Sequence, residues 1–134
     1  MPRFVLLAAL ALLMAVSAFA QKQDPDHIDP ATIVPACTKT TPPPCASTPP
    51  KVTHQPDAKY PKEARKHKIE GIVVLYLVVG TDGRTHNIGV VRSLGYGLDE
   101  AAIEAVKKWK FRPALTEQRV PVPVAIEIEI RFHL

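Results

Sequence analysis

Hydrophobic and polar positions alternate regularly along the last fifteen residues of the chain. Between Val120 and Leu134 one set of alternate positions is apolar, and the other set is mostly charged. The apolar set is Val122, Val124, Ile126, Ile128, Ile130 and Phe132, and the charged set includes Glu127, Glu129, Arg131 and His133. A period of two is typical of a strand with one buried face. The pattern predicts a long final strand with one face in the core and the other in solvent.

The stretch from Gly97 to Pro113 has the period of a helix instead. Its apolar residues fall at i, i+4, i+7, i+8 and i+11: Leu98, Ala102, Ala105, Val106 and Trp109. Such a stripe indicates an amphipathic helix that packs on a sheet. Acidic residues open it and lysines close it, as the helix dipole favours, and Pro113 is expected to end it. We expect Trp109 to anchor this helix in the core.

Two further elements precede this helix. Tyr60-Pro61 is expected to open a short helix over Lys62 to Ile69, since proline suits the first helical position, and Gly71 is expected to end it. The run from Ile72 to Val79 is apolar without alternation, which predicts a central strand covered on both faces.

A hairpin is expected to follow the central strand. Asp82-Gly83 is the signal for a two-residue turn, because glycine adopts positive φ without steric cost. The return strand, about Thr85 to Leu94, is interrupted by Gly89 and suits an edge.

These elements predict an α+β fold in the order helix, strand, strand, helix, strand. We expect a two-layer sandwich with a three-stranded antiparallel sheet, ordered return strand, central strand, last strand, and both helices on one face. The other face of the central strand then needs a cover, which is either the proline-rich arm described below or a second copy of the domain. The second alternative predicts a tendency to form a homodimer.

The expected position of the last strand has a functional consequence. An edge strand presents unpaired N–H and C=O groups that can pair with another strand. Pro121 and Pro123 protect only its beginning, and nothing in the sequence blocks pairing from Val124 to Phe132. Three interpretations stay open: strand addition by a partner peptide, strand exchange in a homodimer, or coverage by a helix or linker of the same chain.

The front of the chain has a different composition. Residues 1 to 20 combine Arg3, an apolar run and the sequence Ser17-Ala18-Phe19-Ala20, which predicts a cleaved signal peptide; a short uncleaved anchor is the alternative. Nine of the fourteen prolines lie between Pro25 and Pro56. Residues 21–55 are therefore expected to form an extended proline-rich linker. Cys37 and Cys45 either form a disulfide in an oxidising compartment or remain free or intermolecular thiols.

Several classes of function do not fit the sequence. The formal charge is +4, but the basic residues cluster at the two helices without interleaved aromatics, so nucleic-acid binding is not expected. The chain contains no G-x-S-x-G or H-E-x-x-H motif, and its cysteines lie in the arm. We therefore expect that the protein is not an enzyme and that it has no catalytic residue, cofactor or metal site.

The residues from about Pro56 to Leu134 resemble a known family, the C-terminal domain of the energy transducer TonB. The resemblance rests on the order and spacing of Tyr60-Pro61-x-x-Ala64-Arg65, Ile69-Glu70-Gly71, Asp82-Gly83-Arg84, Val90-Val91-Arg92-Ser93, Leu98-Asp99-Glu100-Ala101-Ala102, Trp109-Lys110-Phe111-Arg112-Pro113-Ala114 and Pro121-Val122. Within this pattern we expect structural roles for Gly83, Trp109, Phe111 and Pro113.

The resemblance implies a periplasmic protein-binding module for energised transport of substrates such as iron–siderophores. The last strand would pair with the TonB box, a short extended segment of an outer-membrane receptor. Carried over by residue, the partner-binding positions are Val124, Ala125, Ile126, Glu127, Ile128, Glu129, Ile130, Arg131 and Phe132, together with Asp57, Ala58, Lys59 and Tyr60.

The resemblance also implies two alternatives for the front of the chain. If it is uncleaved, it anchors the protein in the inner membrane, where a proton-driven motor complex is the implied partner. If it is cleaved, the chain is an exported adaptor, or a homodimeric interaction protein, without energy coupling.

Overall fold

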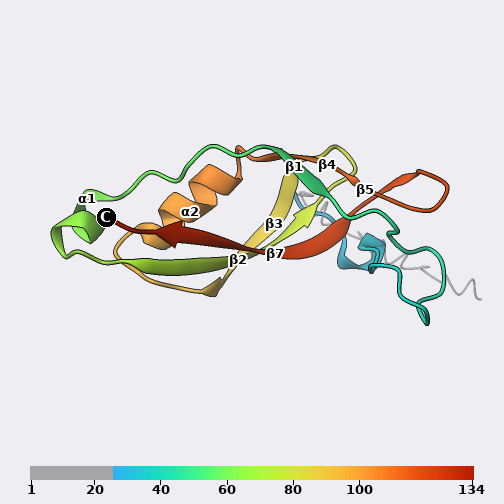
Figure 1. Ribbon diagram of the computed structural model, residues 1–134, viewed down its shortest axis with the longest axis horizontal. Coiled ribbons are helices and arrows are strands. Elements are labelled where there is room, and N and C mark those ends of the chain that lie inside the picture. Colours follow the sequence, from blue (N-terminus) through green and yellow to red (C-terminus); the bar gives the residue numbers. More distant parts are fainter. Residues whose placement is uncertain (1–25) are drawn as a thin grey trace, which may run out of the picture.

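The computed structural model describes residues 26–134, which form a three-stranded main sheet with both helices on one side, two small two-stranded sheets and a packed N-terminal arm (Figure 1). In chain order the elements are η1 (Pro30–Thr32), β1 (Lys51–His54), α1 (Lys62–Lys66), β2 (Gly71–Val79), β3 (Thr85–Arg92), α2 (Leu98–Val106), β4 (Lys110–Arg112), β5 (Ala114–Leu115), β6 (Pro121–Val122) and β7 (Val124–Phe132).

The main sheet has three strands in the order β3-β2-β7. Both neighbouring pairs are antiparallel, so β3 and β7 run parallel at opposite edges. One face of β2 is fully buried through Val73, Leu75, Leu77 and Val79. The α+β class, the strand order and the position of the last strand at an edge are as the sequence predicted.

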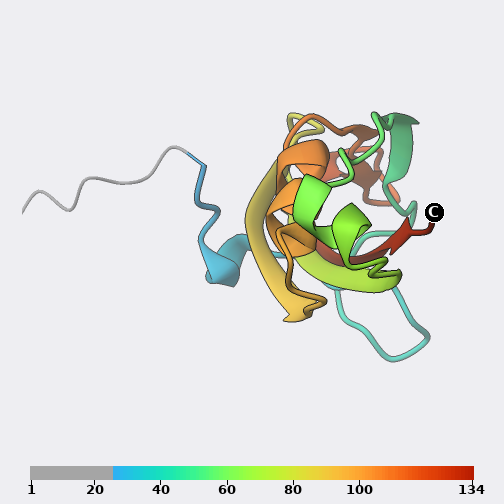
Figure 2. The same cartoon turned by 90° about the vertical axis from the view of Figure 1, so that its left-hand side faces the viewer.

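Both helices lie on the same face of the sheet (Figures 1 and 2). Ala64 of α1 and three residues of α2 (Leu98, Ala102 and Val106) are fully buried in one cluster with the β2 side chains. The stripe of apolar residues that predicted α2 is therefore the face that packs on the sheet.

The predicted helix from Gly97 to Pro113 is wrong at its C-terminal end, because α2 stops at Val106. Lys108 and Trp109 donate backbone hydrogen bonds to residues three positions earlier, which tightens the last turn and ends the helix. The chain then becomes β4, and Pro113 lies between two strands instead of ending the helix. Trp109 is nevertheless buried, with 7% of its surface exposed.

The first helix and the hairpin also differ in detail from the prediction. Helix α1 ends at Lys66 instead of Ile69, and Lys68 adopts a left-handed conformation with φ of 52°. The hairpin forms, but Val79 pairs with Thr85, so its loop covers residues 80–84 instead of two residues. Gly83 has φ of 75°, the positive value for which glycine was expected there.

The proline-rich arm is not the extended spacer that the sequence predicted. From residue 26 onward it packs against the domain, because the residues between its prolines keep backbone N–H groups that find acceptors. β1 pairs antiparallel with β4, joining Lys51 to Arg112. The Val34 N–H donates to the Pro123 carbonyl oxygen at 2.8 Å, far along the sequence.

The arm covers part of the second face of the sheet. It is attached to β3 through Ile28 and Asn87 and to the chain before β7 through Val34 and Pro123. Val78 pairs with residues of both β3 and β7, lies between these attachments and is fully buried. Two residues earlier on the same face, Tyr76 is 36% exposed. The prediction that both faces of β2 are covered is therefore wrong at Tyr76.

No helix within residues 26–134 is both long enough and apolar enough to cross a membrane. The predicted signal peptide at residues 1–20 lies outside the described residues.

Candidate functional site at the outer edge of β7

The outer edge of β7 is the candidate site. β7 pairs with β2 along its whole length, from Val124 opposite Val79 to Phe132 opposite Gly71. Among residues 26–134 it has no second ladder partner. The N–H and C=O groups directed away from β2 are therefore available to a further strand.

The side chains of β7 follow the predicted alternation. Val124, Ile130 and Phe132 are buried, whereas Glu127 and Glu129 are exposed. The nine residues predicted from Val124 to Phe132 thus share one strand with one core face and one solvent face. The buried core face fixes which side of β7 faces the helices, and therefore the register at which a further strand could pair.

One end of this edge is bordered by the segment before α1. A cleft of about 520 Å³, here called the tryptophan cleft, lies between residues 55–58 and the end of β7. Its lining is Gln55, Pro56, Asp57, Ala58, Tyr60, Trp109, Glu129, Ile130, Arg131, Phe132 and His133. The structure therefore brings Asp57, Ala58 and Tyr60 together with the predicted strand. Lys59 lines a separate cleft that faces α2.

Two aromatic side chains fix this segment in position. The Trp109 Nε1–H donates to the Pro56 carbonyl oxygen at 3.0 Å. The Tyr60 ring meets Phe132 edge-to-face with centroids 5.7 Å apart, and its hydroxyl donates to the Ile69 carbonyl oxygen. Edge-to-face contacts of this kind add to the stabilisation from burial.

The other end of the edge is bordered by the N-terminal arm. A second cleft of about 530 Å³, here called the arm cleft, lies between the arm and the beginning of β7. Its lining is Ile33, Val34, Pro35, Ala36, Cys37, Ala46, Ser47, Pro49, Pro50, Val124, Ala125 and Ile126. The sequence left coverage by the linker open as one alternative but did not predict which arm residues form this wall, because a proline-rich segment carries no signal of which strand it will contact.

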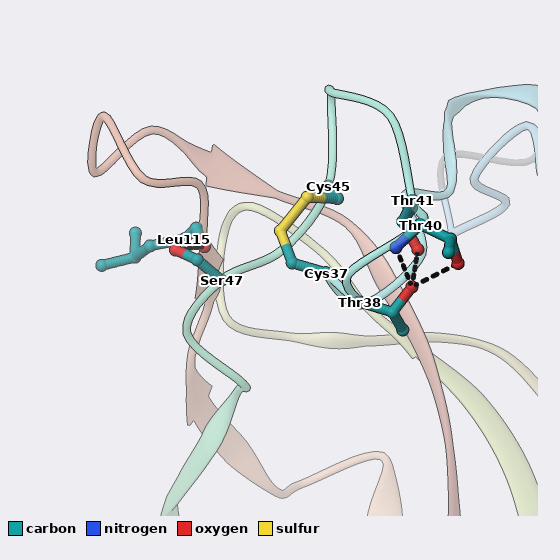
Figure 3. Close-up of a disulfide and its surroundings, with 7 residues drawn as sticks. All are labelled: Cys37, Thr38, Thr40, Thr41, Cys45, Ser47 and Leu115. Carbon is teal, nitrogen blue, oxygen red and sulfur yellow. Dashed lines mark hydrogen bonds between the residues drawn. A yellow bond between two sulfur atoms is a disulfide. The ribbon is translucent and has the colours of Figure 1, made fainter.

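The disulfide predicted as one alternative is present beside the arm cleft. Cys37 and Cys45 are bonded, with their Cα atoms 5.0 Å apart (Figure 3). The bond closes a loop whose two ends also share the backbone hydrogen bond from Cys37 N–H to the Ala46 carbonyl oxygen.

The residues expected to be structural connect the elements around the site, and Trp109 also lines the tryptophan cleft. Gly83 accepts a 2.8 Å backbone hydrogen bond from Phe111 N–H, which ties the hairpin loop to β4. The rings of Trp109 and Phe111 are 6.3 Å apart. Pro113 separates β4 from β5, in place of the helix-ending role predicted for it.

Within residues 26–134, no group of three or more His, Cys, Asp or Glu side chains is placed so that it could hold a metal ion. Near the start of the arm, Asp29 accepts a hydrogen bond from Ala31 N–H at the beginning of η1.

The fold and this site define a class of protein: a small α+β domain that presents one edge strand between two clefts. Residues 56–134 match the family model described as the Gram-negative bacterial TonB protein C-terminal, and the chain belongs to that family. The resemblance predicted from the sequence motifs is thereby confirmed.

Individual relatives agree with this assignment. The chain is 39% identical over 84 residues to Protein TonB of Vibrio cholerae, covering 62% of this chain and 34% of that protein. It is 42% identical over 62 residues to Protein tonB2 of Pseudomonas aeruginosa, covering 46% of this chain and 23% of that protein. The matched part thus spans about a third or less of these relatives' length.

A solved structure shows the same fold. The solution structure of the Pseudomonas aeruginosa TonB C-terminal domain superposes with a TM-score of 0.52 at 24% identity, covering 63% of this chain and 86% of that one.

Proposed function

We propose that this protein binds an extended segment of a partner protein by adding it as a fourth strand to the outer edge of β7. The observation that carries the proposal is that β7, paired with β2 from Val124 to Phe132, has no second partner strand among residues 26–134. Main-chain hydrogen bonds would supply affinity, and side chains in the flanking clefts would supply specificity.

The partner we propose is the TonB box of an outer-membrane receptor, in energised transport of iron–siderophore-type substrates. Membership of the TonB C-terminal family supports this choice. The length of the edge supports it as well, because nine paired residues at about 3.3 Å each match a short extended segment. Asp57, Ala58 and Tyr60, which line the tryptophan cleft, would contact the same segment.

The proposed location is the periplasm. An uncleaved front segment would anchor the protein in the inner membrane and couple it to a proton-driven motor complex. A second candidate is an exported adaptor without energy coupling, favoured by the small residues Ala18 and Ala20 that end the apolar run. Sequencing the mature N-terminus separates the two, since a start at Gln21 would rule out energy coupling by this chain alone.

Strand addition is tested by titrating isotope-labelled full chain with TonB-box peptides of the same organism's receptors. We expect the largest amide shifts over residues 124–132, with residues 85–92 on the opposite edge as an internal control. Peptides that carry one N-methyl group should lose binding at every second position, because only alternate peptide N–H groups face β7. A folded protein that binds none of these peptides, or that loses binding without this period of two, contradicts the proposal.

A further inference from the structure

We propose that the arm cleft is a side-chain subsite that takes one large apolar residue of the incoming strand. The inference rests on the proposed function and concerns a cleft with one wall outside the matched family region, because its arm residues precede residue 56 whereas its other wall belongs to β7. It assigns the proline-rich arm a role in selecting the partner.

The position of the cleft relative to β7 supports this role. Val124, Ala125 and Ile126 are consecutive residues of β7, and all three line the cleft. Consecutive strand residues point to opposite faces of a sheet, so a cleft that reaches all three opens at the edge of the strand. The side chains of a strand paired with this edge would point alternately to the two faces of the sheet, and one that points to the face on which the arm lies would enter the cleft.

The chemistry of the walls selects the kind of side chain. No charged residue lines the arm cleft, and its polar groups are limited to backbone and the Ser47 hydroxyl. Its volume of about 530 Å³ accommodates an aromatic or branched aliphatic side chain. Burial of such a side chain is favourable, whereas a charged one would lose its hydration without a partner.

The opposite end of the edge has different chemistry. The tryptophan cleft is lined by Asp57, Glu129, Arg131 and His133 in addition to its aromatic floor. An incoming strand therefore meets an apolar subsite beside residues 124–126 and a polar one beside residues 129–133. This difference would fix both the register and the direction of the bound segment.

The walls of the arm cleft are held before any partner binds. The Cys37–Cys45 disulfide closes the loop, and Ala46 N–H donates to the Pro35 carbonyl oxygen at 2.8 Å. Ser47 N–H donates to the Leu115 carbonyl oxygen at 2.8 Å, which attaches this loop to β5 (Figure 3). A prearranged subsite costs less ordering entropy on binding than a mobile one.

The test is a double-mutant cycle by calorimetry on the full chain. The probes are a TonB-box peptide and derivatives in which each apolar residue in turn is replaced by serine. The protein variant is Ala36→Glu, which places a carboxylate on an exposed position of the cleft wall. We expect one peptide position at which serine weakens binding to the wild-type chain by about tenfold or more, and to Ala36→Glu by about twofold or less.

Arg92→Ala, an exposed position of β3 at the opposite edge of the sheet, is the control and should keep the full tenfold effect at that peptide position. Pro49→Glu, a second exposed wall position, replaces Ala36→Glu if circular dichroism shows that the latter is unfolded. Binding with the same serine effect in all variants would overturn the subsite and leave strand addition intact. Failure of every peptide to bind the folded wild-type chain would overturn both proposals.

Discussion

The indole Nε1–H of Trp109 donates a hydrogen bond to the carbonyl oxygen of Pro56 at 3.0 Å. This bond joins the residue that follows the last turn of α2 to the segment that precedes α1, 53 positions earlier. Because residues 55–58 form one wall of the tryptophan cleft, Trp109 both fills the core and positions part of the candidate site.

Replacing Trp109 separates these two roles. Trp109→Ala should lower the free energy of unfolding by about 3 to 5 kcal/mol, since it empties a buried aromatic site. Trp109→Phe keeps a ring but removes the donor, and should cost about 1 to 2 kcal/mol. Urea unfolding measures both values. The phenylalanine variant should also bind peptide more weakly while it remains folded, and wild-type stability of the alanine variant would contradict the packing described here.

The main sheet was predictable because its signals are local. Alternation from Val122 to Phe132 and the apolar run of β2 depend only on neighbouring residues and on the period of a strand. The end of α2 was not predictable in this way, since Trp109 satisfies the helical stripe although it lies after the helix. After the tightened last turn of the helix, Lys110–Arg112 pairs with β1, and this contact is non-local. β1 belongs to the segment that was predicted to be an extended proline-rich linker.

The candidate site also has one part with local sequence signals and another part that depends on non-local contacts. The nine residues of β7 were predicted, since an edge follows from strand order. The arm cleft and the bond from Trp109 to Pro56 were not, because both depend on which distant backbone groups meet. Two sequence features indicated that the arm has a fixed place: the Cys37–Cys45 spacing in a chain expected to be exported, and the second face of the central strand, which needs a cover.

Gly83 should tolerate substitution less well than Gly95, although both have positive φ, 75° and 73°. A Cβ at Gly83 would lie 2.2 Å from the Phe111 carbonyl oxygen, whereas a Cβ at Gly95 would meet no atom within 4 Å. Gly95→Ala should therefore cost only the left-handed backbone penalty, about 1 to 2 kcal/mol. Gly83→Ala should cost about 1 to 3 kcal/mol more, from the clash. Equal midpoints in thermal unfolding would contradict this.

The ionised side chain of Asp99 should stabilise the fold at neutral pH and lose this effect at acidic pH. Partial burial raises the pKa of Asp99. Hydrogen bonds from Ser93 Oγ and from the Leu94 and Gly95 N–H groups lower it by more than burial raises it, so the pKa lies below its usual value of 3.8. A carboxyl group with a lowered folded pKa stabilises the fold above its unfolded pKa, and the contribution is lost as pH falls through the folded value.

Asp99→Asn should therefore be less stable than the wild type at pH 7, with a difference that shrinks as pH falls below 3.8. Urea unfolding at a series of pH values from about pH 2 to about pH 7 measures how the difference in unfolding free energy changes with pH. Glu100→Gln is the control, since Glu100 is exposed and no hydrogen bond to its side chain is found in residues 26–134. A difference that grows toward low pH would show that the sign is wrong.

Asn87 should hold the beginning of the arm on β3. Its Oδ1 accepts from Ile28 N–H at 2.9 Å, and its Nδ2 donates to the Ile28 carbonyl oxygen at 2.8 Å. Asn87→Gly removes both bonds yet tolerates the positive φ of 51° at this position. We expect faster hydrogen exchange at the Ile28 amide and unchanged exchange in β7. Unaltered protection at Ile28 would show that the arm is held by other contacts.

Removal of the arm should make the domain associate. Val78 is fully buried where the arm crosses the sheet, and Tyr76 beside it is already 36% exposed. A chain that starts at residue 55 would therefore expose a larger apolar area on this face, which favours burial against a second copy. Sedimentation velocity should show concentration-dependent association for the shortened chain and weaker association for the same chain with Val78→Thr. A shortened chain that stays monomeric at high concentration would contradict a covering role for the arm.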